Sequence, residues 1–393
     1  MDDILIKDAL IVTCDPAHAI IKNGLITVSD GRITALESSD TVSVDSFRAK
    51  KTISANGNIV MPGLINMHCH AADSLFRGLV ENLPLEEWLG RVWIAEKAIL
   101  TPETTHLGSI LGLAENLLSG ATTVMDMFWY PEETANAAKK LGMRISTGGI
   151  FFDLPGIGGR CHEDYISEAH QFSQNHEADE NVIPAILPHG SYTVSPENLT
   201  DAKRIADEYG ILFCTHAAET KAEQNDIKTR YNNSVIRHLN EHKLLGENVV
   251  LAHCVHLDEK EISLFDLDMW LAMRLTCGLA KGINMEADAL TAEQVLHMAT
   301  INGAKALGKS ESIGSLEIGK CADIIMVDVN NSHSIPLFDP ITHLVFGAGR
   351  SDITDVFVSG KHIVKNKKIT GIDIEKIYDQ VRELAPQIKA SLE

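Results

Sequence analysis

The strongest constraint on the fold is a repeated alternation of apolar and amphipathic segments between residues 59 and 254. The apolar segments have the length of buried strands, and the segments between them have the periodicity of helices. Such a β/α succession is typical of a parallel sheet covered by helices, so we predict an α/β barrel. The expected strands lie near 59–67, 121–127, 143–150, 182–188, 210–216 and 248–254, and the expected helices near 102–118, 131–141, 162–175, 197–209 and 231–243.

Both ends of the chain have a different pattern, that of short strands joined by turns. Residues 3–60 contain the hairpin signal Asp30-Gly31, and residues 314–370 contain similar apolar runs separated by glycine-containing turns. We predict that the two ends form one small β-sandwich. The expected domains are a composite β-sandwich of residues 1–58 and 311–372, a barrel of residues 59–310, and a C-terminal helix of residues 373–393.

Three histidine clusters follow predicted strands of the barrel. Because side chains alternate along a strand, His68 and His70 point the same way while Cys69 points away. His216 can supply a third metal ligand from another strand, and Glu219, three residues later, can reach a metal-bound water. His253 ends the next strand. All of them lie at the carboxyl ends of strands, where barrel active sites are built, so a hydrolytic metal site is expected.

The composition favours an ordinary cytoplasmic enzyme. A net charge of −20 argues against nucleic acid or an anionic membrane as the main partner. The N-terminus lacks the pattern of a secretory signal, and no apolar stretch approaches the roughly 20 residues needed to span a bilayer. The 7 cysteines have no C-x-x-C spacing and indicate free thiols in a reducing compartment.

Four segments together resemble the amidohydrolase superfamily, and most closely its branch that deaminates 5'-methylthioadenosine, S-adenosylhomocysteine and 5'-deoxyadenosine. The segments are residues 60–70, 216–220, 251–257 and 298–304. The resemblance implies a TIM-like (β/α)8 metal-dependent hydrolase barrel acting on a small nucleoside, and members of the family often form homo-oligomers. It also implies that His68, His70 and His216 bind one divalent ion, zinc in the first place, with iron or manganese as alternatives.

The same resemblance implies roles for five other side chains. Glu219 would transfer the proton to the purine, and His253 would polarise the attacking water or the intermediate. Glu96 would accept hydrogen bonds from the ribose hydroxyls, while His189 and Arg160 would face the substrate. The family has a second arginine, but its position here is Gly148. A carboxylate-bearing 5' tail would lose a charged hydrogen bond worth roughly 1.5 to 3 kcal/mol, so smaller 5' substituents are expected.

One region departs from the family pattern. After the sixth strand and the start of the next helix, the chain passes at Phe265-Asp266 directly to a segment that in the family follows the eighth strand. A parallel crossover needs about a dozen residues, so strands seven and eight have no room. Either the molecule contains residues that this sequence lacks, which we favour, or the deletion is real, in which case Asp266 is the nearby carboxylate that could replace the family's metal-binding aspartate.

Two other functions stay open from the residues alone. One is another hydrolytic deaminase or chlorohydrolase of the superfamily, acting on a guanine-like or triazine ring. The other is a catalytically inactive homologue that serves as a binding subunit, which the missing metal aspartate would explain.

Overall fold

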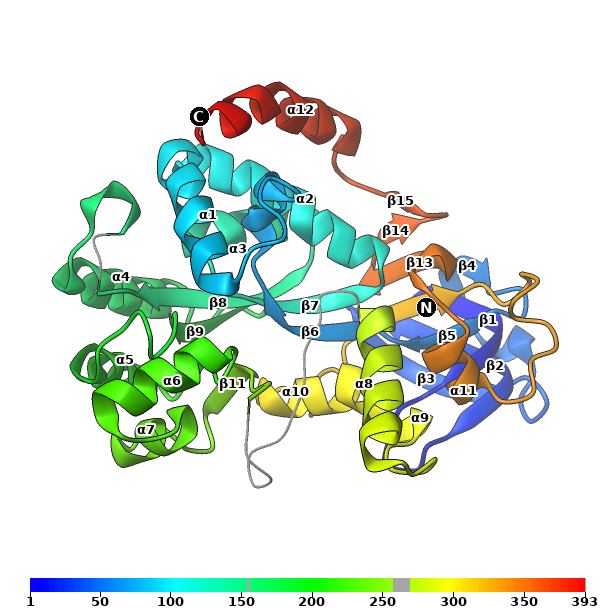
Figure 1. The fold of residues 1–393 in the computed structure, drawn as a ribbon. Helices are drawn as coiled ribbons and strands as arrows, with labels where there is room; N and C mark the ends of the chain where they lie inside the picture. The colour runs from blue at the N-terminus through cyan, green and yellow to red at the C-terminus, as the bar shows by residue number, and fades with distance from the viewer. Residues whose placement is uncertain (154–155, 257–268, 393) are drawn as a thin grey trace.

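The centre of the molecule is a parallel sheet of six strands. The computed structural model describes residues 1–153, 156–256 and 269–392 (Figure 1). The strands pair in the order β11-β10-β9-β8-β7-β6. Their bounds are β6 Leu64–Cys69, β7 Ala121–Asp126, β8 Arg144–Phe151, β9 Val182–Pro188, β10 Leu212–Ala217 and β11 Val249–His253. The predicted α/β class with parallel strands is confirmed.

The connecting helices pack against the outer face of this sheet, and their starts follow local rules. Thr101 and Ser195 cap α2 and α5 by accepting a backbone N–H, and a proline stands in the first turn of each helix. The helix predicted near 231–243 is α7, which begins only after its cap Ser234; α6, which ends at the left-handed Asn232, was not predicted. The helices that follow β6 to β10 along the chain are α1 Leu85–Ile99, α2 Pro102–Leu118, α3 Pro131–Leu141, α4 His162–Asn175, α5 Pro196–Tyr209, α6 Lys221–Tyr231 and α7 Val235–Glu241.

A second sheet joins the two ends of the chain, as predicted. It has nine strands, in the order β15-β14-β13-β12-β5-β1-β2-β3, with β4 paired to β1. The predicted strand 59–67 divides at Gly63: β5 pairs with β1 and β12 in this second sheet, and only β6 enters the six-stranded sheet. The bounds are β1 Asp2–Val12, β2 Ile20–Ser29, β3 Arg32–Ser38, β4 Ala49–Ser54, β5 Ile59–Pro62, β12 Ile324–Val327, β13 Ile353–Val358, β14 Lys361–Lys365 and β15 Lys368–Ile369.

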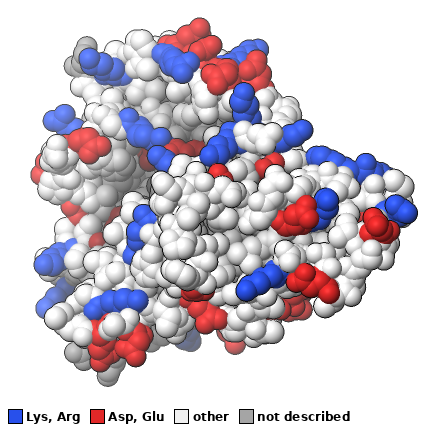
Figure 2. Space-filling view, turned by 90° about the vertical axis from the view of Figure 1, so that its right-hand side faces the viewer, with Lys and Arg blue, Asp and Glu red and all other residues white. Residues whose placement is uncertain are grey.

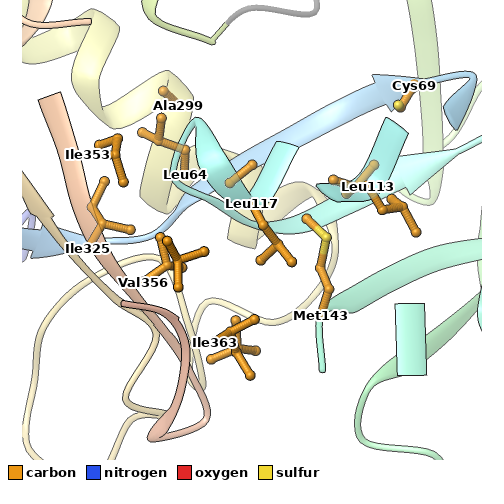
Figure 3. Close-up of a cluster of buried hydrophobic side chains, with 14 of the residues drawn as sticks. Leu64, Cys69, Leu113, Leu117, Met143, Ala299, Ile325, Ile353, Val356 and Ile363 are labelled. Carbon is orange, nitrogen blue, oxygen red and sulfur yellow. The ribbon is translucent and has the colours of Figure 1, made fainter. Parts of the chain in front are cut away.

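The two sheets share one apolar core. Figure 3 shows Leu64 and Leu117 from the six-stranded side close to Ile325 and Val356 from the second sheet. A buried ion pair crosses the same boundary, because the guanidinium of Arg144 at the start of β8 contacts the carboxylate of Asp323. The other oxygen of Asp323 accepts the backbone N–H of Ser359 at 2.8 Å. This pairing satisfies charges that would be costly if left alone in the interior.

The six-stranded sheet curls without a seventh or eighth strand in the described residues. Its edge strand β11 is apolar yet mostly half-buried, whereas β7 and β8 are buried along their whole length. The segment after α8 instead covers the inner face: Ile301, Ala304 and Leu307 pack with Ile65 and Cys214 from the strands. The expected continuation near Phe265 and Asp266 lies outside the described residues.

The remaining helices come after β11 in the chain. They are α8 Met269–Asn284, α9 Ala292–His297, α10 Gly303–Ala306, α11 Pro340–Phe346 and α12 Ile374–Ala390, with a π-helical turn at Met298–Asn302 and 3-10 turns at Val44–Ser46, Ala71–Phe76 (η2), Ile157–Gly159 and Arg350–Asp352. The last helix, α12, packs against α2 (Figure 1).

Basic and acidic side chains are interspersed on the face in Figure 2. Among the described helices, none is long and apolar enough to cross a membrane.

The packing of residues 301–313 inside the curled sheet predicts a position-dependent cost of leucine truncation. Leu307 is 4% exposed within this cluster, so Leu307→Ala should lower the free energy of unfolding by about 2–5 kcal/mol. The matched control is Leu279→Ala on α8, where the side chain is 49% exposed and the expected change is within about 0.5 kcal/mol. Urea denaturation measures both. Equal free energies of unfolding for the two variants would contradict the packing of residues 301–313 inside the curled sheet.

Candidate metal centre and active site

Three imidazoles meet at the carboxyl end of the six-stranded sheet. His68 and His70 stand on the same side at the end of β6, and His216 comes from β10. One ligand atom from each lies within 4.8 Å of the others. Both ring nitrogens of His216 are buried and have no hydrogen-bond partner in the structure. A buried polar atom without a partner is costly, so this imidazole fits a role as metal ligand.

The surroundings keep these histidines in the form that binds metal. Burial lowers the pKa of His68, His70 and His216, and neighbouring imidazoles lower the pKa of His68 and His216 further. Each ring is therefore neutral at pH 7. The Nδ1 of His70 lies 2.5 Å from the carbonyl oxygen of Met127. Because a carbonyl only accepts, Nδ1 carries the proton and Nε2 is left as the donor atom for a metal.

Glu219 is turned toward these histidines by the backbone that follows β10. Ala218 adopts a left-handed conformation with φ of 53°, and the N–H of Glu219 then donates to Glu223 Oε2 at 2.7 Å. The Oε1 of Glu219 lies 3.4 Å from Nε2 of His253, and the hydroxyl of Tyr192 donates to Oε2 at 3.4 Å. Burial, together with the charge of Glu223, raises the pKa of Glu219 to about 7.

His253 completes this group from the edge strand. Its ring centroid lies 4.9 Å from that of His68 and 5.0 Å from that of His216. Burial lowers its pKa to about 4, with a contribution from His70. The first and last strands of the six-stranded sheet therefore bring His68 and His253 side by side.

A cavity of about 380 Å³ opens in front of the histidines. His189 lines it, 4.8 Å from His216 between ring centroids, and its Nδ1 lies 2.8 Å from the hydroxyl of Thr193. Glu96 lines it from α1 and accepts the indole N–H of Trp129 at 2.8 Å. The walls are largely aromatic, with Trp88, Trp93, Phe128, Trp129, Phe152 and Tyr192. This shape suits a flat ring with a polar substituent.

Asp73 also lines the cavity, and the sequence analysis missed it. It lies in η2, three residues after His70. Burial raises the pKa of Asp73 to about 7, and burial together with the charge of Asp73 raises the pKa of Glu96 to about 8. The position directly after the two histidines was the available signal.

Arg160 is not among the residues that line the cavity. Its Nε donates to Glu168 at 2.8 Å, and its guanidinium lies 4.6 Å from the centroid of the Tyr130 ring. It borders a separate pocket with Tyr130 and Glu168. At Gly148 a Cβ would lie only 2.1 Å from the carbonyl oxygen of Ala185, so β9 leaves no space there for a longer side chain. Neither expected arginine position therefore offers a cation to the cavity.

In the described part of the chain, the clustered ligand set consists of the three histidines without a carboxylate. Asp266, considered as a replacement, falls outside the described residues. Three protein ligands and an open position are the arrangement typical of catalytic rather than structural zinc.

Removing one imidazole should remove the metal. We expect His216→Asn to lose stoichiometric divalent metal after purification in zinc-containing buffer, because two ligands hold the ion too weakly. The matched control is His106→Asn, whose imidazole contacts Glu133 away from the cavity. Elemental analysis of the purified proteins measures metal per chain, and stoichiometric metal in His216→Asn would contradict the assignment.

Comparison with known proteins agrees with this geometry. The profile of the Amidohydrolase family matches residues 59–269 and 262–363. The chain is similar to the 5-methylthioadenosine/S-adenosylhomocysteine deaminase of Syntrophobacter fumaroxidans, with 31% identity over 98% of each chain. It is also similar to the 5'-deoxyadenosine deaminase of Methanosarcina acetivorans, with 34% identity over 99% of each chain. The first alignment runs over 432 positions, more than the 393 residues of this chain, so the chain carries gaps relative to that relative.

Among solved structures, an adenosine deaminase from Xanthomonas campestris with bound zinc superposes with a TM-score of 0.94, at 28% identity and 99% coverage of both chains. A triazine hydrolase from Arthrobacter aurescens, at 21% identity, covers 98% of this chain with a TM-score of 0.88, which shows the shared fold alone. On the family profile and the near-full-length relatives together, the chain belongs to the amidohydrolase family.

Proposed function

We propose that the protein is a metal-dependent hydrolase that releases the 6-amino group of adenosine-type nucleosides as ammonia. The names of its relatives suggest 5'-methylthioadenosine and 5'-deoxyadenosine as substrates. The observation that carries the proposal is the meeting of three histidines, Glu219 and His253 at one end of an aromatic cavity. A three-histidine site with an adjacent carboxylate supports hydrolysis by an activated water.

The metal would be held by His68, His70 and His216, and we propose zinc. When bound, such an ion lowers the pKa of a water molecule to about 7. The orphaned nitrogens of His216 and the neutral state of all three rings support this role.

Glu219 would carry the protons of the reaction. It takes one proton from the attacking water and delivers it to N1 of the purine while the water oxygen bonds to C6. It then moves the remaining hydroxyl proton to the amino group, which leaves as ammonia. A pKa of about 7 suits a group that must both accept and donate a proton near neutral pH. His253, 3.4 Å from Glu219, would hold the attacking water.

The other end of the cavity would hold the sugar and its 5' substituent. Glu96 has one oxygen engaged by Trp129, and its carboxyl group can accept a hydrogen bond from a ribose hydroxyl. The aromatic walls can stack on the purine. S-adenosylhomocysteine fits less well, because its carboxylate would find neither Arg160 nor an arginine at residue 148 in the cavity.

Glu219→Gln tests the proton transfer. The amide cannot carry a proton between water and purine, so we expect ammonia release from 5'-methylthioadenosine to fall by about 10²–10⁴-fold. Metal content should stay stoichiometric, because Glu219 is not a member of the histidine cluster. Ammonia assays and elemental analysis on the same preparation give both results. Turnover close to that of the unmodified protein would refute the role of Glu219.

Glu96→Ala separates a nucleoside substrate from a free base. Loss of the hydrogen bond between Glu96 and ribose should lower kcat/KM for 5'-deoxyadenosine by about 10-fold. Any turnover of adenine, which has no ribose, should be spared in the same variant. Unchanged kinetics with 5'-deoxyadenosine would show that Glu96 does not bind ribose, and would favour a free-base substrate of the guanine or triazine type.

A further inference from the structure

Glu223 is a buried carboxylate that contacts the backbone of Glu219. It lies in the first turn of α6 and is 4% exposed. Its Oε2 accepts the N–H of Glu219 at 2.7 Å, and its Oε1 accepts the hydroxyl of Ser191 at 3.1 Å. Glu223 is not among the residues that line the cavity in front of the histidines. Any effect that it has on the reaction must therefore pass through its neighbours.

The start of α6 has a cap of its own without this carboxylate. The hydroxyl oxygen of Thr220 accepts the N–H of Glu223 at 3.0 Å. Helices α5 and α7 begin with the same kind of cap, and the residue three positions after the cap is Asn198 in one and Arg237 in the other. A capped helix start does not require an acidic residue at this position. Because burial of a carboxylate is costly, its presence in α6 needs another explanation.

The turn between β10 and α6 supplies that explanation. Ala218 has a φ of 53°, a left-handed conformation that is unfavourable for a residue with a side chain. Burial raises the pKa of Glu223, while the N–H groups of Glu219, Ala218 and Thr220 oppose the rise. The contacts that the structure describes for this carboxylate are with N–H and O–H donors, and none is with a cation. The carboxylate therefore stabilises the turn from which the side chain of Glu219 projects.

The same carboxylate joins this turn to the loop after β9. Ser191, which donates to it, is 3% exposed, and the next residue, Tyr192, donates its hydroxyl to Oε2 of Glu219 at 3.4 Å. Glu219 is thus held at its backbone through Glu223 and at its side chain through Tyr192. A displacement of a reacting group by about 1 Å can lower a rate about 10²-fold, so the backbone contact bears directly on turnover.

We propose that Glu223 is a positioning residue, which fixes the backbone of Glu219 so that the carboxyl group of Glu219 is directed toward the purine. This inference rests on the proposed deaminase function and adds to it a residue outside the cavity. The reaction then requires at residue 223 a hydrogen-bond acceptor for the N–H of Glu219, rather than a negative charge.

Glu223→Gln and Glu223→Asp separate the acceptor from the charge. The amide oxygen of Gln can accept the N–H of Glu219 while the amide nitrogen donates to Ser191, so kcat for 5'-methylthioadenosine should stay within about threefold of that of the unmodified protein. Asp keeps the charge but withdraws the acceptor by one methylene, so kcat should fall by about tenfold. KM and metal content should be unchanged in both variants, because Glu223 lines neither the cavity nor the metal centre.

The matched control is Asp164→Ala, which removes a carboxylate that accepts the N–H of Cys161 at the start of α4 and should leave kcat unchanged. Unchanged kcat in Glu223→Asp, or a loss in Glu223→Gln as large as that in Glu223→Asp, would overturn the positioning role and leave the deaminase function intact. Absence of ammonia release by the unmodified zinc-loaded protein would overturn the deaminase function itself.

A double variant tests whether Glu223 acts through Glu219. Once Glu219→Gln has removed the proton transfer, the direction of this side chain no longer matters, so adding Glu223→Asp should cause no further loss of kcat. A further loss of about tenfold in the double variant would show that Glu223 acts independently of Glu219, and would overturn the proposal.

Discussion

The approach of β6 to β11 is the constraint on which the whole site depends. His68 ends the first strand of the six-stranded sheet and His253 ends the last, and their ring centroids are 4.9 Å apart. A closed barrel would bring these strands together through two further strands. In the described residues the six-stranded sheet itself curves until β6 and β11 approach each other. The segment around α10 packs inside the curve. Gly303 matters in this packing, since a Cβ there would lie 2.9 Å from Cγ2 of Ile65.

Burial sets the charge state of the site. It lowers the pKa of the histidines and raises the pKa of Asp73, Glu96 and Glu219, because a charged group is disfavoured away from water. The result is a set of neutral imidazoles, the form that can bind a cation, beside a carboxyl group, that of Glu219, with a pKa of about 7. Such a separation of roles by environment is a recurrent property of active sites.

The sequence predicted the parts of this molecule that follow from local rules. Alternation along a strand placed His68 and His70 on one side, and apolar runs located the strands of the sheet. The family resemblance placed Glu96 and His189 at the cavity.

Arg160 could not be placed in the same way, because a loop side chain is directed by its neighbours, here Glu168 and Tyr130. The transfer of β5 to the second sheet was also hidden, because buried strands of either sheet have the same apolar pattern. Asp73 was missed because its position three residues after His70 does not tell which way its side chain turns; the folded structure shows that it lines the cavity.

The three histidines, Glu219 and the aromatic cavity would together form a working hydrolytic deaminase in a chain with six described strands in its parallel sheet. The most direct test is product analysis after incubation of the zinc-loaded protein with 5'-methylthioadenosine in water enriched in a heavy oxygen isotope. We expect an inosine-type product that carries one heavy oxygen at C6, with ammonia released in equal amount, and loss of both when the metal is removed by a chelator. A folded protein that holds stoichiometric metal and forms no such product would contradict the account and identify the chain as an inactive homologue that binds rather than converts its ligand.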